Sequence, residues 1–331
     1  IYSIMTFPKI GVLDGRKGMG AWNWLLEFKE RLAQNLARAL PEPQAALAQG
    51  ILLGLRSSIP QDLMDAFNRS GTTHIIVISG HNLTLLAGYL VMVGQPLIGR
   101  RRALWFSLAG ILVYTILVGA QPPVVRASIM GGIFILGAYL GRQRDAVIPL
   151  ALAAAGMAAF QPLLLWDVSF QLSFAATAGL IILAPPIQAS LQRLWPSSGG
   201  VQQAAHAGAR SYLIESLAVT LAATAAVLPL LLVNFQRLSL VAPLANLLVL
   251  PALPGIMLAG ALTSGLGFLE PLGQVAGWTA WPFLTYMVAT VELLAKLPLA
   301  AIEVQGFLPE LALSYYSLLA LAMLWLHKAR S

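Results

Sequence analysis

The sequence contains no cysteine and very few charged residues. Among its 331 residues there is no Cys, which excludes disulfide bonds and thiolate metal sites. Charged residues make up 10% of the chain, whereas a typical soluble domain has about 25%. Hydrophobic residues make up 58%, and the mean hydropathy is +0.77. This composition argues against a soluble globular domain and predicts a membrane protein.

Sequence signatures of catalysis are also missing. There is no GxxxxGK(S/T) loop, so nucleotide hydrolysis by the P-loop route is not expected. The histidines, His74, His81, His206 and His327, are scattered without metal-ligand spacing. Ser79 and His81 are two residues apart, which places them on different faces of a helix and argues against a nucleophile–base pair. We therefore expect no catalytic site, no metal and no cofactor.

Long intervals without Lys, Arg, Asp or Glu set the predicted architecture. A spanning helix needs about 20 mostly apolar residues, and backbone groups in lipid must hydrogen-bond internally. The intervals are residues 72–99, 103–125, 127–141, 146–166, 168–192, 216–236, 238–269, 271–291 and 311–327. We predict an all-α fold, a polytopic transmembrane bundle of about eight or nine spanning helices with broken or re-entrant helices.

The first 70 residues differ from the rest. Residues 1–20 read as irregular, and 44–55 form an apolar stretch that is too short to span, so we expect it to be re-entrant. Residues 21–40 predict an amphipathic helix in the membrane interface, with a surface helix of a soluble domain as the alternative. Its apolar residues are Trp22, Leu25, Leu32, Leu36 and Leu40, opposite Glu27, Lys29, Glu30, Arg31 and Arg38.

The arginines between the predicted spans give an orientation. Counting spans from residue 72 collects most of them on one face, and the positive-inside rule makes that face cytoplasmic. They are Arg100, Arg101, Arg102, Arg142, Arg144, Arg193 and Arg210. We therefore expect a multi-pass protein of the cytoplasmic (inner) membrane with residues 1–70 on the extracytoplasmic side.

Two predicted spans are interrupted. Ser79-Gly80-His81-Asn82 breaks the first one, either to line a pore or as a packed kink in which Asn82 bonds a neighbouring helix. Pro243, Pro251 and Pro254 divide the interval 238–269, which is either two half-helices or one kinked span.

A few other polar residues lie where hydrocarbon should exclude them. Arg126 follows two prolines and needs a partner or water inside a membrane, although near a helix end it could reach the interface. Asp167 and Gln171 share one helix face with Phe174 nearby, and a helix cap is the alternative for Asp167. Asn246 lies inside the broken interval, where its amide could face a channel.

Four strings are similar to motifs of one known family. Residues 71–82 read GTTHIIVISGHN and resemble its GLTHLLAISG-x-H signature; residues 122–130 read PPVVRASIM and are similar to PSVVRAAIM. Residues 167–174 read DVSFQLSF and match DxSFQLSF; residues 235–250 resemble FGxLSLVSPLANLLVLP. In this order, over residues 41–260, the strings resemble the ComEC family, the DNA-uptake channel of natural transformation. The chain departs from that pattern at Asn82, where much of the family has His, and at Pro123, which replaces Ser.

The resemblance implies that residues 41–331 form the membrane-embedded competence domain. It also implies that residues 1–20 are the end of an extracytoplasmic OB-fold domain. We expect neither the rest of that OB-fold domain nor the family's metallo-β-lactamase-like domain, with which strand degradation is associated, within these residues. We therefore expect no nuclease activity here.

Our leading hypothesis is a conduit for single-stranded DNA, because proteins that bind single strands combine cationic groups with aromatic faces. The predicted path residues are Ser79, His81, Asn82, Arg126, Asp167, Phe170, Gln171, Phe174 and Asn246. Arg100, Arg101 and Arg102 would attract the emerging strand, and Asp167 is expected to pair with Arg126. The expected partners are single-stranded DNA, the lipid bilayer, and a cytoplasmic motor or proteins that capture the strand.

Two alternatives remain open at this point. The interrupted spans loosely fit a small-solute secondary transporter with a midplane site, although no inverted repeat is detected. An intramembrane nuclease or protease is a weaker alternative, because no paired acid or nucleophile–base arrangement is present.

Overall fold

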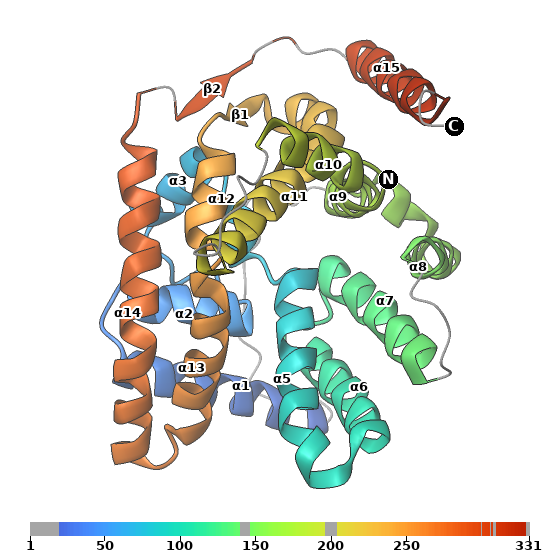
Figure 1. Cartoon of the computed structure of the whole chain (residues 1–331). Helices are drawn as coiled ribbons and strands as arrows, with labels where there is room; N and C mark the ends of the chain where they lie inside the picture. Colours follow the sequence, from blue (N-terminus) through green and yellow to red (C-terminus); the bar gives the residue numbers. More distant parts are fainter. Residues whose placement is uncertain are drawn as a thin grey trace, which may run out of the picture.

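The structure is a computed structural model, and it describes residues 20–139, 146–195, 204–298, 300–304, 306 and 309–328. It is nearly all-α (Figure 1). The helices of the first half are α1 (Gly20–Ala39), α2 (Gln44–Leu53), α3 (Gln61–Ser70), α4 (Thr73–Ile76), α5 (Gly80–Ile98), α6 (Arg100–Leu117) and α7 (Pro122–Tyr139). The second half has α8 (Val147–Phe160), the 3-10 helix η1 (Pro162–Trp166), α9 (Val168–Ile182), α10 (Ala184–Leu194), α11 (Ala204–Phe235), α12 (Ala242–Val249), α13 (Ala252–Leu266), α14 (Glu270–Ala295) and α15 (Pro309–Lys328). The predicted all-α class is confirmed.

Two short strands join distant parts of the chain. β1 (Arg237–Ser239) pairs antiparallel with β2 (Ala301–Glu303), and Arg237 lies opposite Glu303. Their side chains form an exposed ion pair at 2.8 Å. Because β1 follows α11 and β2 follows α14, the pairing fixes the ends of these two helices close to each other.

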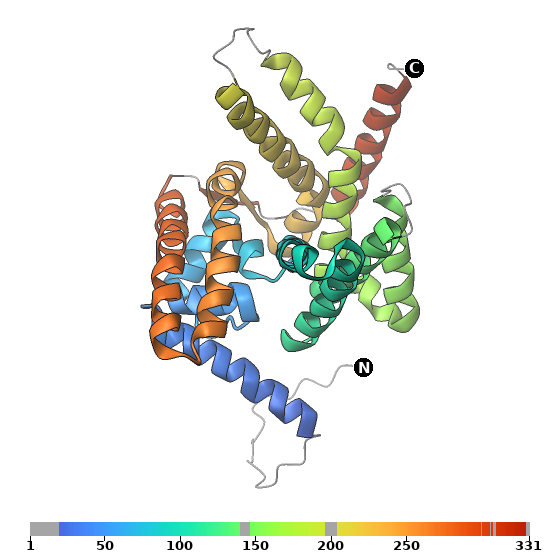
Figure 2. The ribbon, with the colours of Figure 1, turned by 60° about the horizontal axis from the view of Figure 1, so that its bottom comes forward.

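The largest core surrounds α2 (Figure 2). Every residue of α2 from Ala45 to Leu53 is buried, which fits a helix that is apolar on all faces. It packs among α1, α13 and α14, and Gly260 lets α13 approach closely, since a Cβ there would lie 2.6 Å from Leu52. At about 15 Å a ten-residue helix reaches only halfway across a bilayer. This placement agrees with the expected re-entrant segment, whose depth in a membrane stays a prediction.

The predicted amphipathic helix exists as α1, and its packing explains its pattern. Leu32, Leu36 and Leu40 are buried in the core around α2. Near the N-terminus, Trp22 and Trp24 are exposed. The apolar face of the C-terminal half is thus covered by protein, so only the first turns are free to contact lipid. The interfacial position of α1 remains a prediction.

Two smaller cores complete the fold. One joins α5, α6 and α7 around Ile78, Leu83 and Ile111. The other joins α9, α10 and α11 around Leu183, Ala222 and Ala226. The predicted break before Asn82 is present, because α4 ends at Ile76 and α5 begins at Gly80.

Fewer described helices qualify as membrane spans by length and composition than the sequence predicts. Over the described residues, one helix is long and apolar enough to span a membrane, Arg210–Phe235 within α11. Two bent pairs also qualify if each is one span: α9 with α10, bent by 49°, and α12 with α13, bent by 48°. The bend between α12 and α13 confirms the predicted break of the interval 238–269. The count of eight or nine spans stays a prediction.

The bend between α9 and α10 was not predicted, because residues 168–192 read as one continuous span. Pro185 and Pro186 occupy the first turn of α10, where their missing N–H groups cannot continue the hydrogen bonds of α9. Leu183 therefore ends one helix and begins the next.

Candidate functional site

Arg126 is a buried cation without an acidic partner. It lies one turn into α7, which begins at Pro122, and its side chain is 4% exposed. Its Nη1 atom is buried without a hydrogen-bond partner. In the part of the chain that the structure describes, the one ion pair is Arg237–Glu303. Among these residues, therefore, no carboxylate neutralises Arg126.

An aromatic pair from another helix lies against this cation. The Cζ atom of Arg126 is 5.3 Å from the ring centroid of Phe174 on α9. Phe174 in turn contacts Phe170, with ring centroids 4.3 Å apart. Three of the predicted path residues are thereby brought together, although they are 44 and 48 positions apart in the sequence. We call Arg126, Phe170 and Phe174 the Arg–Phe cluster.

The expected ion pair between Asp167 and Arg126 is not formed, which corrects the sequence-based prediction. Asp167 is exposed and caps α9, with its Oδ1 accepting a hydrogen bond of 2.8 Å from the N–H of Phe170. Gln171 donates from Nε2 to the carbonyl of Leu165 at 2.9 Å. Asp167 thus satisfies one of the first N–H groups of α9, which lack partners within the helix. Gln171 instead binds a carbonyl of η1.

Asn82 is fully buried and ties α5 to α2. Its Nδ2 donates to the carbonyl of Ile51 at 3.3 Å, and its Oδ1 accepts from Ser79 Oγ at 3.3 Å. The last carbonyls of a helix have no partners within it, so Asn82 satisfies one at the C-terminus of α2. This geometry supports the packed-kink interpretation for Asn82, while His81 next to it is exposed.

Asn246 also carries a buried polar atom that has no partner. It lies on α12 with 8% exposure, and its Oδ1 is buried without a hydrogen bond. An unsatisfied buried acceptor costs about 1–3 kcal/mol. Its side chain therefore remains a candidate for contact with water or a bound molecule.

The predicted cytoplasmic arginines are only partly described. Arg100, Arg101 and Arg102 form the first turn of α6 and are exposed. Arg142 and Arg144 lie outside the described residues.

Sequence reasoning missed three hydrogen bonds that join distant parts of the chain. Tyr114 OH donates to the carbonyl of Leu52 at 2.8 Å. Leu52 directly follows Ile51, whose carbonyl Asn82 binds. Tyr89 OH donates to the carbonyl of Pro254 at 2.9 Å. Arg56 Nη2 donates to Gln121 Oε1 at 3.2 Å, directly before α7. Tyrosines inside apolar intervals could have signalled such bonds, because a buried hydroxyl needs a partner.

A family model described as "Competence protein" matches residues 51–329. The chain is 26% identical to ComE operon protein 3 of Bacillus subtilis (strain 168) over 239 residues, 72% of this chain and 28% of that protein. It is 27% identical to competence protein ComA of Neisseria gonorrhoeae over 305 residues, 88% of this chain and 40% of that protein. It is also 27% identical to the uncharacterized protein YcaI of Escherichia coli (strain K12), over 64% of this chain and 28% of that protein.

The chain thus spans well under half the length of these relatives. No solved structure matches it.

Proposed function

We propose that this chain, which belongs to the competence protein family, forms part of the passage through which single-stranded DNA crosses the cytoplasmic membrane. The competence family takes part in DNA uptake during transformation, and the names of two relatives refer to competence. The proposal adds a mechanism: residues of this chain contact the strand as it crosses.

The observation that carries the proposal is the uncompensated charge of Arg126. A buried cation without an anion is strongly unfavourable, since removing a charge from water costs several kcal/mol even after relaxation. Such a group persists where it meets water or an anion during function. A nucleic acid strand supplies one phosphate anion per nucleotide, which suits a single cation that each phosphate contacts in turn.

The aromatic neighbours of Arg126 support the same interpretation. Single-strand-binding proteins combine cations for the backbone with aromatic rings for the bases, and stacking contributes about 1–3 kcal/mol per base. In the Arg–Phe cluster, Phe174 is half-buried beside the guanidinium of Arg126. The aromatic ring and the cation are therefore close enough to contact the base and the phosphate of the same nucleotide. This pairing favours a nucleotide strand over a small apolar solute.

The surface supports membrane insertion of more helices than α11 alone. Large apolar side chains are exposed on most of the long helices, whereas soluble proteins rarely expose contiguous apolar patches. Examples are Leu97, Val113, Leu152, Leu262, Trp278 and Leu318. We propose a multi-pass arrangement with residues 1–70 outside the cytoplasm, where a cytoplasmic motor or strand-capturing proteins draw the DNA inward.

The proposal is tested by replacing Arg126 in a naturally transformable host that lacks its own copy of the protein. Arg126→Met keeps the length of the side chain and removes the charge, and we expect internalised labelled DNA to fall at least about tenfold, since charge-assisted hydrogen bonds contribute roughly 1.5–3 kcal/mol. Arg126→Lys should retain part of the uptake, and Arg193→Met, at an exposed site on α10, should retain all of it.

A stability measurement separates function from folding. Replacing an uncompensated buried charge by an apolar side chain is often neutral or stabilising, so the purified Arg126→Met variant should unfold at the same or a higher temperature. Normal DNA uptake by this variant at an equal membrane level would exclude Arg126 from the path. Lower thermal stability together with lower uptake would show that the cation is structural.

A further inference from the structure

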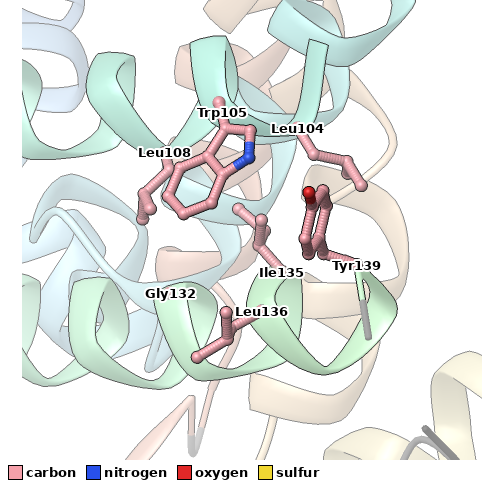
Figure 3. Close-up of a pocket in the computed structure, with 7 residues that line it drawn as sticks. All are labelled: Leu104, Trp105, Leu108, Gly132, Ile135, Leu136 and Tyr139. Carbon is pink, nitrogen blue, oxygen red and sulfur yellow. The ribbon is translucent and has the colours of Figure 1, made fainter. Parts of the chain in front are cut away.

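An apolar pocket lies between α6 and α7 (Figure 3), and none of its lining residues belongs to the Arg–Phe cluster. Its volume is about 190 Å³, smaller than the roughly 300–1,000 Å³ of pockets for drug-sized ligands. It is lined by Leu104, Trp105, Leu108, Gly132, Ile135, Leu136 and Tyr139. A narrow space with such a lining suits a single hydrocarbon chain.

Glycine on α7 keeps this pocket open. Residues 132, 135, 136 and 139 recur at helical spacing and form one face of α7. A Cβ at Gly132 would lie 3.4 Å from Leu108 Cδ1, an ordinary contact, so alanine fits there and a longer side chain would enter the pocket.

Three cations lie within about one helical turn of the pocket-lining residues of α6. Arg100 and Arg101 precede Leu104 and Trp105 by one helical turn and therefore lie on the same face of α6. Arg100, Arg101 and Arg102 are exposed, and among the described residues the side-chain ion pair found is Arg237–Glu303, which leaves these three guanidinium groups without a carboxylate.

The aromatic residues of the pocket are those typical of a membrane boundary. Trp105 and Tyr139 lie edge to face, with ring centroids 5.7 Å apart. Both types are enriched where hydrocarbon meets headgroups, because one end of the ring system is apolar and the other polar.

We propose that this niche binds an anionic phospholipid, with one acyl chain in the pocket and the phosphate on Arg100, Arg101 and Arg102. Charge complementarity selects the occupant, since basic pockets between helices on the cytoplasmic side bind anionic headgroups. The inference rests on the proposed membrane insertion and orientation, and it does not depend on the Arg–Phe cluster.

The test measures thermal unfolding of the whole purified chain in a neutral detergent. Didecanoyl phosphatidylglycerol should raise the midpoint by about 3 °C or more at saturation. Didecanoyl phosphatidylcholine and free glycerol phosphate should each raise it much less, because one lacks the net negative charge and the other lacks the acyl chains.

Three variants test whether the shift arises from binding at this niche. Gly132→Leu fills the pocket and should abolish the shift, whereas Gly132→Ala should keep it. The triple variant Arg100→Gln, Arg101→Gln, Arg102→Gln leaves helix packing untouched and should reduce the shift to that of phosphatidylcholine.

Several results would overturn the proposal. Equal shifts with both lipids would remove the headgroup preference, and an equal shift with free glycerol phosphate would indicate a simple anion site. A full shift of the unfolding midpoint in Gly132→Leu would place the acyl chain outside this pocket. If the triple variant kept the lipid shift and lost binding of a short single-stranded oligonucleotide, the arginines would belong to the DNA path. Since the assay contains no uptake step, loss of uptake in Arg126→Met leaves it unaffected.

Discussion

At the scale of single residues, Asp167 shows how a polar group in an apolar segment can serve the backbone. Its carboxylate accepts the N–H of Phe170 and thereby caps the helix that carries Phe170 and Phe174. Asn is an equally good cap, whereas loss of a cap costs about 1 kcal/mol. Asp167→Ala should therefore lower the free energy of unfolding by about 1 kcal/mol, and Asp167→Asn should change it little.

The same two variants distinguish a capping role of the Asp167 side chain from a role of its negative charge. If the cap is what matters, transformation frequency with Asp167→Asn stays at the level of the unmodified protein. A large loss with Asp167→Asn, at unchanged thermal stability, would show that the negative charge itself takes part in transport.

Sequence reasoning identifies which residues are unusual, but it does not identify their partners. Arg126 and Asn246 stand out in apolar intervals, and both are buried with an unpartnered atom. The bond from Asn82 to Ile51, in contrast, joins residues 31 positions apart. It depends on how α2 ends against α5, and neither helix alone encodes that approach.

At the scale of elements, close packing of α9 on α11 positions the Arg–Phe cluster. A Cβ at Gly179 would lie 2.4 Å from the Cβ of Ala226 and 2.8 Å from the carbonyl oxygen of Ala222. Small residues at such crossings let helices in membranes approach closely. Gly179→Leu should therefore destabilise the protein by about 1–3 kcal/mol through overpacking.

A matched glycine provides the control for this prediction. A Cβ at Gly156, on α8, would meet no atom within 4 Å, so Gly156→Leu should leave the unfolding temperature nearly unchanged. Because Gly179→Leu displaces α9, it should also lower DNA uptake. Equal thermal stability of the two variants would contradict the packing of α9 against α11.

The sequence predicts which segments are helices more completely than it predicts where those helices bend or break. Apolar intervals predict helices, and the prolines of 238–269 predict a break, which is present as the bend between α12 and α13. The break at Pro185 is not predicted by the length of the charge-free interval, because that length takes no account of where prolines lie. Glycine contacts such as that of Gly179 depend on the neighbouring helix, so sequence periodicity does not specify them.

At the scale of the whole molecule, the proposed orientation gives a direct prediction. These 331 residues contain no cysteine, so one introduced thiol gives the only maleimide signal from this chain. Ser57 lies in the exposed link between α2 and α3, and Arg101 lies at the start of α6. In spheroplasts, a membrane-impermeant maleimide should label Ser57→Cys at once and Arg101→Cys only after permeabilisation. Labelling of both without permeabilisation would contradict the proposed topology.

The central claim is that a DNA strand passes the Arg–Phe cluster, and photo-crosslinking tests it most directly. Phe174 is replaced by p-benzoylphenylalanine in cells that are taking up labelled DNA, and Phe160, which is 95% exposed on α8, is replaced in a control strain. The account predicts an ultraviolet-dependent adduct between protein and single-stranded DNA at position 174 and none at position 160. No adduct at 174, or equal adducts at both positions while DNA still enters the cell, would contradict it.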